Sequence, residues 1–477
     1  MILNNLINNF NNFLWSYVLI IMLISLGLFF SFKTKFIQIR YIKEMFILLG
    51  DGFGDKSESS KHSVSSFQAF CISTASRVGT GNLAGIAMAI SVGGPGAIFW
   101  MWLIAIVGAA SSFIESTLAQ LYKVKDEKHF RGGPAYYIEK GLKKPLIGIL
   151  FSILITITFG LVFNSVQSNT IGIAFNEAFG VSTIWVGLAI TMLTAFIICG
   201  GIKRVAKVSE IIVPILAILY IAISLFVVIK NIGTLPSVIA MIFKYAFGLK
   251  QFLGGTLGGT LLIGIKRGLF SNEAGMGSAP NAAATADVTH PVKQGLIQTL
   301  GVFTDTLIIC SCTAFIILLS DINIDSSLTG IQLTQRALTS QVGSWGTIFV
   351  AICILLFAFS SIVGNYYYGE CNIKFITSNK FILLTYRILV VLMVMMGSIM
   401  SMDIVWTLAD LFMGLMALIN LISIALLHKK AIIALNDYVT QKNNGIKDPI
   451  FDASKYDEFD DLELWKINAK EDEEIAS

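Results

Sequence analysis

Residues 77–82 (RVGTGN) place an arginine, two glycines, a threonine and an asparagine in the middle of an apolar segment. An arginine at the centre of a membrane helix costs at least about 2.5 kcal/mol on insertion scales. A helix interruption releases backbone groups, whose N–H can bind a carboxylate and whose carbonyls can bind Na⁺. The pattern predicts an interrupted helix that lines a cavity. A packing contact between Gly81 and Gly85 is the alternative, although it leaves the polar side chains unexplained.

Residues 264–280 (GIKRGLFSNEAGMGSAP) show the same combination of glycine and polar residues between two apolar segments. Further glycines precede them at 254–259, and an alanine-rich run follows. An ordinary loop outside the membrane has a similar composition and is the alternative interpretation. Because apolar segments flank the stretch on both sides, we predict a second interrupted helix.

Polar residues in other apolar segments could complete a site between the two interruptions. Gln167 suits hydrogen bonding to a polar ligand, with a bond between helices as an equal alternative. Ser360 and Ser361 offer adjacent hydroxyl groups, which suit a hard cation.

Two acidic residues, Glu115 and Asp305, each stand alone in an apolar segment. Either could partner Arg77 or the neighbouring pair Lys266 and Arg267. We expect these acids to form structural pairs, with a proton relay as the alternative.

The elements that position these residues are membrane helices. The 477-residue chain is 55% hydrophobic and 13% charged, whereas a soluble globular protein is roughly 25% charged. About 20 apolar residues span a bilayer. We therefore predict an all-α integral membrane protein with eleven transmembrane helices. They lie near 14–32, 66–90, 94–122, 145–177, 183–200, 208–229, 251–285, 293–319, 344–369, 381–400 and 404–427. Residues 36–49 and 234–247 are too short to span and are expected along the membrane interface.

Lys and Arg are unevenly distributed between the loops of this arrangement. Alternate loops contain nineteen of them, and the intervening loops contain four. Cytoplasmic loops are enriched in Lys and Arg, so the N-terminus is predicted outside and the C-terminus in the cytoplasm.

The two predicted interruptions each open a block of five spans. The domains are then an N-terminal helix with a basic cytoplasmic loop (1–65), a first repeat (66–230), a second repeat (251–428) and a cytoplasmic tail (429–477). Five is an odd number, so the second block has inverted orientation, as in transporters with inverted repeats. The tail is polar and acidic, and we expect it to be disordered or loosely helical, with a regulatory contact as the alternative.

The composition also excludes several classes of function. A net charge of +4 gives no support for a nucleic-acid partner. The four histidines lie in loops or at span ends, and the cysteines suit packing as free thiols. The chain has no HExxH, Walker A or Ser-His-Asp pattern. We therefore expect no enzyme activity and no cofactor.

Five stretches of the chain resemble the alanine or glycine:cation symporter family. They run from about 65 to 375 and are STASRVGTGNLAGIAMAISVGGPGAIFWMW, ASSFIESTLAQLYK, RGGPAYYIEKGL, RGLFSNEAGMGSAPNAAATADVTHPVKQGL and FAFSSIVGNYYYGE. The resemblance implies a leucine-transporter-like core of ten helices preceded by one extra N-terminal helix. It also implies symport of a small neutral amino acid with Na⁺ across the inner (plasma) membrane of a prokaryote.

The resemblance also implies a substrate site and a sodium site. The substrate residues would be Gly79, Thr80, Gly81, Asn82, Gln167, Ser271, Asn272, Gly275, Gly277 and Asn365. Na⁺ would bind carbonyls near Ser73 to Ser76 and the hydroxyls of Ser360 and Ser361.

The sequence departs from many alanine-type members of this family at Asn365, where they have a tryptophan. An amide is smaller than an indole and can form hydrogen bonds, so glutamine joins alanine and glycine as a candidate substrate. A simple packing change at this position is the alternative.

We therefore predict a secondary active transporter that imports a small neutral amino acid with Na⁺ by alternating access. Its partners would be the amino acid, Na⁺ and the lipid bilayer, and we expect it to function as a monomer. A proton-coupled symporter and a channel are the alternatives. The sequence leaves open the choice among alanine, glycine and glutamine.

Overall fold

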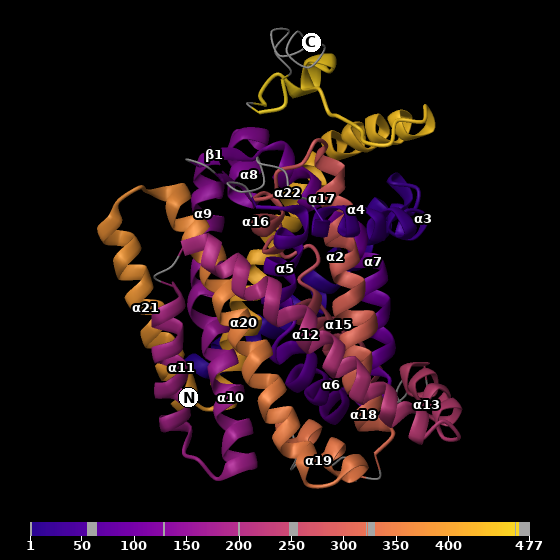
Figure 1. Ribbon diagram of the computed structural model, residues 1–477, viewed down its shortest axis with the longest axis vertical. Helices are drawn as coiled ribbons and strands as arrows, with labels where there is room; N and C mark the ends of the chain where they lie inside the picture. Colours follow the sequence, from indigo (N-terminus) through magenta and orange to yellow (C-terminus); the bar gives the residue numbers. More distant parts are fainter. Residues whose placement is uncertain are drawn as a thin grey trace.

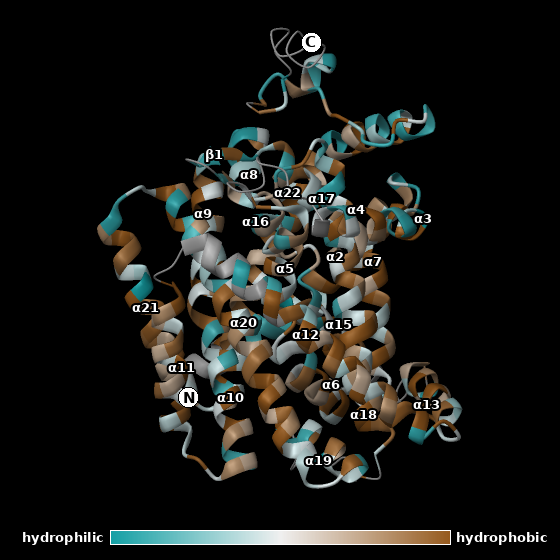
Figure 2. Ribbon diagram, in the orientation of Figure 1, coloured by the Kyte–Doolittle hydropathy of each residue, from teal (hydrophilic) through white to brown (hydrophobic). Residues whose placement is uncertain are grey.

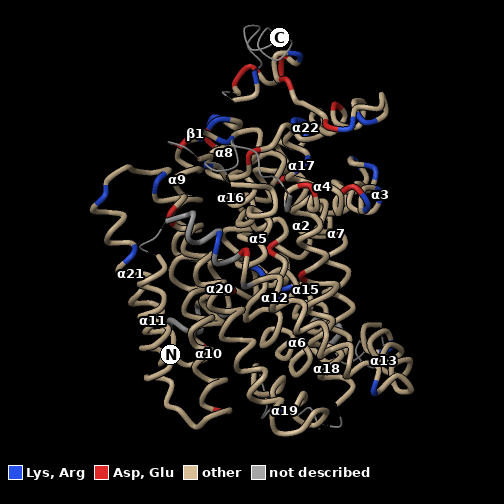
Figure 3. Tube along the Cα trace, viewed as in Figure 1, with Lys and Arg blue, Asp and Glu red and all other residues tan. Residues whose placement is uncertain are grey.

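The computed structural model describes residues 2–54, 64–126, 129–198, 201–247, 256–320, 322, 330–462 and 464–466. The chain forms an elongated bundle of helices, with the N-terminus in one half and the C-terminus at the opposite end (Figure 1). The middle of the bundle is predominantly hydrophobic (Figure 2). Lys and Arg gather toward the end that carries the C-terminus (Figure 3). We call this end the basic face.

Within the described ranges, eight helical segments are long and apolar enough to cross a membrane. They are Asn9–Lys33, Ala97–Leu121, Pro145–Phe179, Val213–Lys230, Pro291–Leu318, Trp345–Ile376, Lys380–Ile399 and Met402–Asn443. Their elements are α1 (Ile2–Phe13), η1 (Leu14–Leu19), α2 (Ile20–Lys33), α7 (Ala97–Leu121), α9 (Pro145–Ile155), η4 (Thr156–Phe163), α10 (Asn164–Phe179), α12 (Gly201–Lys230), α17 (Pro291–Val302), η5 (Phe303–Cys310), α18 (Ser311–Leu318), α20 (Trp345–Ile376), α21 (Lys380–Ile399) and α22 (Met402–Asn443). The chain is thus a multi-pass membrane protein.

Both predicted interruptions are present as breaks between helices. The first break separates α5 (Ser66–Arg77) from η3 (Gly81–Gly85) and α6 (Ile86–Gly93). The second break separates α15 (Thr256–Asn272) from the short α16 (Ala279–Ala283). The prediction of an interrupted helix is therefore confirmed at both places.

The remaining elements are shorter. They are α3 (Ile37–Arg40), α4 (Ile42–Gly54), α8 (Pro134–Leu142), α11 (Thr183–Ile198), α13 (Leu235–Phe247), α19 (Ile331–Val342) and the 3₁₀ turns η6 (Ala453–Lys455) and η7 (Asp457–Phe459). Strands β1 (Val124–Asp126) and β2 (His129–Arg131) form an antiparallel pair. The segments 36–49 and 234–247 contain α3, the first part of α4 and α13. Their location along the membrane interface stays a prediction.

Packing divides the bundle into two groups of helices around the breaks. Helix α7 packs against α2, α15 and α17, whereas α10 packs against α20 and α21. The broken helix α5 contacts both α17 and α20, so it lies between the groups. Tyr386 of α21 illustrates the tight packing of the second group, because a Cβ at Gly160 or Gly369 would overlap its ring.

Two parts of the chain differ from the sequence-based expectations. Helix α22 continues to Asn443, well past the predicted end of the last span near 427. The tail was expected to be disordered or loosely helical, and this is wrong for its described part. Phe451, Phe459 and Trp465 are buried against the basic face, because the tail carries apolar anchors among its acidic residues. Residues 467–477 lie outside the described residues.

Candidate functional site

The first break exposes backbone N–H groups that side chains from other positions bind. The N–H of Gly79 donates to Asn82 Oδ1 at 2.9 Å. The N–H and the hydroxyl of Thr80 both donate to Gln167 Oε1, at 3.0 and 2.6 Å. A Cβ on Gly79 would overlap Ser361 Oγ and lie 2.9 Å from Gln167 Oε1. The fold therefore needs glycine here, because α10 and α20 approach the backbone directly.

The carbonyl side of the first break faces a serine of α20. Ser361 Oγ lies 2.8 Å from Ala75 O, 3.3 Å from Val78 O and 3.1 Å from Phe357 O. One hydroxyl has a single hydrogen to donate, so two of these carbonyls keep acceptor capacity. Oxygen atoms grouped in this way are the ligands that a hard cation prefers.

The serines predicted for sodium do not all reach this group. Ser360 Oγ donates to Phe357 O of its own helix at 2.8 Å, beside Ser361. Ser73 Oγ donates to Phe70 O, also within its own helix. Ser76 Oγ points instead toward Asn365 and Glu273. Among the described hydrogen bonds, the structure thus brings the hydroxyl of Ser361 to the carbonyls of the break and directs those of Ser360, Ser73 and Ser76 elsewhere.

The second break is held by a carboxylate from α7. The N–H groups of Gly275 and Gly277 each donate to Glu115 at 3.1 Å. Asn420 of α22 binds the same carboxylate at 2.7 Å and the carbonyl of Gly275 at 2.9 Å. Gly275 and Gly277 have φ angles of +83° and +86°, which favour glycine. Asn272 Oδ1 closes the first turn by accepting from the N–H of Ala274.

A buried polar cluster that includes Asn365 joins the two breaks through Ser76 and Glu273. Ser76 Oγ lies 2.7 Å from Asn365 Oδ1 and 3.0 Å from Glu273 Oε1. The amide nitrogen of Asn365 donates to Asn164 Oδ1 at 3.2 Å. Ser278 donates to the other oxygen of Glu273 at 2.5 Å. These side chains are all nearly or fully buried, so the position of Asn365 is polar and enclosed.

Asp305 of η5 links the breaks at a second point. Its carboxylate accepts from Asn82 at 2.7 Å, from Ser271 at 2.7 Å and from the Thr306 hydroxyl at 2.9 Å. Gly81 and Ser271 lie close together here, since a Cβ on Gly81 would be 3.3 Å from Ser271 Cα. The backbones of the two breaks therefore meet beside this carboxylate.

The pairing expected for Glu115 and Asp305 is wrong. Lys266 and Arg267 pair with Asp410 of α22, and the Arg267 guanidinium lies 4.6 Å from the centre of the Trp406 ring. Arg77 donates to the carbonyl of Gln298 at 3.3 Å and makes no ion pair within the described part of the chain. The hydrogen bonds to the two acids come instead from backbone N–H groups and neutral side chains.

The predicted substrate residues fall into three places. Gly79, Thr80, Gly81, Asn82, Gln167 and Ser271 surround the first break, Asn272, Gly275 and Gly277 shape the second, and Asn365 lies in the polar cluster. Sequence reasoning missed the contacts of Asn164, Glu273, Ser278, Asp305 and Asn420. The available signal was a buried polar residue in each apolar helix, but spacing along the chain does not show which helices meet.

A sequence model described as the "Sodium:alanine symporter family" matches residues 1–453. The chain belongs to this family. The amino-acid carrier protein AlsT of Bacillus subtilis (strain 168) is 57% identical over 98% of this chain and 99% of its own length. A second protein of that organism, described as "Probable sodium/glutamine symporter GlnT", is 56% identical over 98% and 97%. The sodium/alanine symporter AgcS of Methanococcus maripaludis is 37% identical over 89% and 94%.

Solved structures support the same fold class. MhsT in complex with L-phenylalanine matches with a TM-score of 0.52 at 15% identity, over 77% of this chain and 97% of MhsT. A manganese transporter of Eremococcus coleocola matches with a TM-score of 0.51 at 12% identity, over 83% of both chains. These likenesses concern the fold alone, which is the leucine-transporter-like fold. The named members of the family are transporters, so this chain is a transporter and not an enzyme.

Proposed function

We propose that the chain imports a small neutral amino acid together with Na⁺ by alternating access, and that glutamine is its preferred substrate. The observation that carries the proposal is the meeting of two helix breaks, which offers N–H donors and carbonyl acceptors within one buried region. A zwitterion and a cation need both kinds of group at once. Membership of the sodium:alanine symporter family supports the same class of cargo.

The carboxylate of the substrate would bind the N–H side of the first break. Thr80 donates its N–H and its hydroxyl to one neutral amide oxygen of Gln167. A carboxylate is a stronger acceptor than an amide, so it can replace Gln167 there. Gln167 would then turn its amide toward the bound substrate.

Na⁺ would bind the carbonyl side of the same break, between Ala75 O, Val78 O and the hydroxyl of Ser361. Asp305 offers a second position for a cation, because the described hydrogen bonds to its buried carboxylate all come from neutral groups. Either Na⁺ or a proton would neutralise it. Proton coupling therefore remains the second candidate function.

Selection for glutamine would come from the polar cluster around Asn365. An enclosed amide and hydroxyl can pair with a carboxamide, whereas an apolar side chain would leave them unpaired. The relative described as a sodium/glutamine symporter is 56% identical to this chain, and the one described as a sodium/alanine symporter is 37% identical. Alanine and glycine remain the competing substrates.

The membrane arrangement that fits this function has eleven spans, in two inverted repeats of five after one N-terminal span. The short helix α11 and the two broken helices would complete the count. The basic face would be cytoplasmic by the positive-inside rule, which places the C-terminus inside and the N-terminus outside (Figure 3). We expect one chain in the inner membrane of a prokaryote to suffice for transport.

Uptake into proteoliposomes that contain the purified protein tests the proposal. With an inward Na⁺ gradient, labelled glutamine should accumulate faster than alanine or glycine, and choline in place of Na⁺ should abolish uptake. Equal accumulation driven by a proton gradient alone would replace sodium coupling by proton coupling. Single-channel currents without saturable uptake would show that the chain is a channel.

A further inference from the structure

The C-terminal strap, here residues 444–462 and 464–466, follows α22 and lies at the basic end of the bundle (Figure 1). Three of its aromatic side chains are buried: Phe451, Phe459 and Trp465 expose 2%, 0% and 7%. Burying one large apolar side chain contributes roughly 1.5–3 kcal/mol. The N–H of Ala453 donates to the carbonyl of Trp465 at 2.7 Å, which folds the strap back on itself. The strap is therefore a docked element.

A small backbone contact closes the bundle beneath the strap. Val64, just before α5, forms a parallel bridge with Ala286, which follows α16. The N–H of Asp287 donates to Val64 O at 3.1 Å. This pair joins the basic-face end of the first broken helix to the end of the second. We call it the Val64–Ala286 gate.

The strap reaches this gate through the end of α7. Trp465 Nε1 donates to the carbonyl of Gln120 at 3.0 Å. The side chain of Gln120 donates to the carbonyls of Ala283 and Ala286, at 2.5 and 3.0 Å. Lys123 donates to Ala286 O at 3.0 Å while its ammonium lies 4.8 Å from the centre of the Trp465 ring. Burial lowers the pKa of Lys123 to about 7.

A second set of contacts holds the other side of the gate. The N–H of Phe451 donates to Thr289 O at 3.0 Å, and Thr289 Oγ1 donates to Pro449 O at 2.9 Å. Asp448 pairs with Lys293 at the start of α17. The strap thus binds the chain on both sides of the α16–α17 connection.

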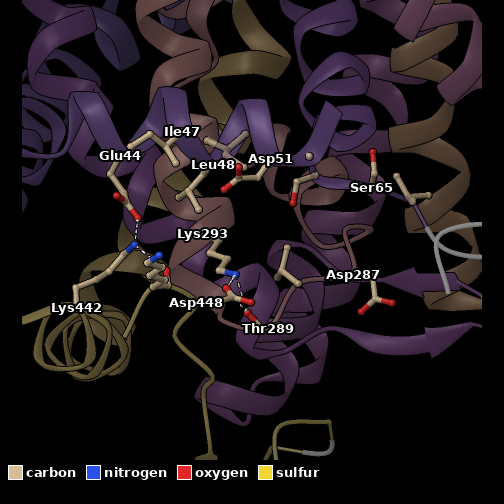
Figure 4. Close-up of a pocket in the computed structure, with 16 residues that line it drawn as sticks. Glu44, Ile47, Leu48, Asp51, Ser65, Asp287, Thr289, Lys293, Lys442 and Asp448 are labelled. Carbon is tan, nitrogen blue, oxygen red and sulfur yellow. Dashed lines mark hydrogen bonds and ion pairs between the residues drawn. The ribbon is translucent and has the colours of Figure 1, made fainter. Parts of the chain in front are cut away.

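A cavity of about 610 Å³ lies beside the gate, lined by Val64, Ser65 and Asp287 among others. Figure 4 shows the Lys442–Glu44 pair on the opposite side from Ser65 and Asp287, and the Asp448–Lys293 pair between them. Lys442 is at the end of α22, and its ammonium lies 2.6 Å from Glu44 of α4. The two pairs join the end of α22 to α4 and the strap to α17.

We propose that the C-terminal strap is a latch that holds the Val64–Ala286 gate closed and must release before the basic face opens. The proposal rests on the proposed transport function, because alternating access requires this gate to open. In this proposal the strap regulates opening, and the partly exposed ion pair between Lys430 and Asp461 helps to hold it in place. That pair joins α22 to the strap at 2.9 Å.

Hydrogen–deuterium exchange of the full-length protein in nanodiscs tests the latch without any transport measurement. Asp461→Lys opposes Lys430 and should release the strap. We expect exchange to rise about tenfold in strap peptides and in peptides that contain the Asp287 amide. The charge-swapped double variant Lys430→Asp/Asp461→Lys should restore protection at both places. Lys455→Ala is the control, because the ion pair described for Lys455 lies within the strap, with Asp452.

Trp465→Ala provides an independent release, since it removes the aromatic anchor and the bond to Gln120. The latch would be overturned if, in either variant, the strap peptides exchanged freely while the Asp287 amide stayed fully protected. A strap that stays protected in both variants would overturn it as well, because the named contacts would not hold it. A protein that shows the expected coupled exchange but no Na⁺-driven uptake would keep the latch and lose the proposed function.

Discussion

At the first break, the N–H of Thr80 donates to the neutral amide of Gln167. At the second break, the N–H groups of Gly275 and Gly277 donate to the carboxylate of Glu115. A neutral acceptor can be exchanged for a charged ligand with a net gain in hydrogen-bond strength. A buried carboxylate that binds two N–H groups and Asn420 has no such replacement. The first break is thus suited to bind a ligand, and the second to keep its shape.

The largest expected effect is the loss of uptake on Gly79→Ala. The new Cβ would overlap Ser361 Oγ and press on Gln167, the two groups that define the first break. We expect initial uptake to fall by at least about a hundredfold, or roughly 2.7 kcal/mol. Gly50→Ala is the matched control, because nothing lies within 4 Å of that Cβ in α4. Normal uptake by a monodisperse Gly79→Ala protein would contradict the close approach.

Gln167→Glu tests whether the first break, unlike the second, loses its function when a carboxylate of the protein occupies it. A carboxylate fixed at Thr80 would occupy the place proposed for the carboxylate of the substrate and repel it. We expect KM to rise about thirtyfold or more, equivalent to about 2 kcal/mol, with little change in melting temperature. Concentration-dependent uptake and thermal unfolding in detergent measure both quantities. An unchanged KM would place the substrate carboxylate elsewhere.

Glu115→Gln should show the opposite pattern at the second break. The amide keeps one acceptor oxygen, so one of the N–H groups of Gly275 and Gly277 loses its partner. A buried donor without a partner costs about 1–3 kcal/mol, and we expect a lower melting temperature. KM for the amino acid in the remaining folded protein should change little. A large change in KM at constant stability would mean that the second break also binds the ligand.

Ser361→Ala tests the carbonyl side of the first break. It removes the hydroxyl that joins the carbonyls of Ala75 and Val78, and we expect the Na⁺ concentration for half-maximal uptake to rise about tenfold, or 1.4 kcal/mol. Ser423→Ala is the control, since that buried hydroxyl bonds only to Ile419 of its own helix. Equal sodium dependence in the two variants would remove Ser361 from the proposed sodium site.

The smallest expected effect is a change of selectivity on Asn365→Trp. The indole would remove the contact with Ser76 and fill space in the polar cluster. We expect the ratio of alanine to glutamine uptake to rise several-fold. This corresponds to a change of roughly 1 kcal/mol in the difference between the binding free energies of the two substrates. Competition between the two labelled amino acids measures it directly. A constant ratio would mean that Asn365 does not face the substrate.

The sequence predicted the two breaks because glycine, arginine and asparagine are out of place in apolar helices. Helix bounds followed from the length of the apolar runs, and most agree with the structure to within a few residues. The partners of the acids did not follow. Glu115 binds residues 160 and 162 positions further along the chain, and no local pattern encodes such a pairing.

The strap shows a different limit of sequence reasoning. Its acidic composition is typical of a solvated tail. An average over the segment gives little weight to the three aromatic residues that are buried in the structure. Phe451, Phe459 and Trp465 become informative only when the surface that receives them is known. The carbonyl of Gln120, which binds the indole of Trp465, belongs to the end of a membrane helix.

The docking of Trp465 also matters for anyone who purifies or images this protein. A fluorescent or affinity tag joined after Ser477 would follow the twelve residues beyond Trp465, whose indole contacts α7. Uptake and hydrogen exchange recorded from such a fusion should therefore be compared with those of the untagged protein. Tags at the amino terminus, which lies toward the other end of the bundle (Figure 1), leave the strap unmodified.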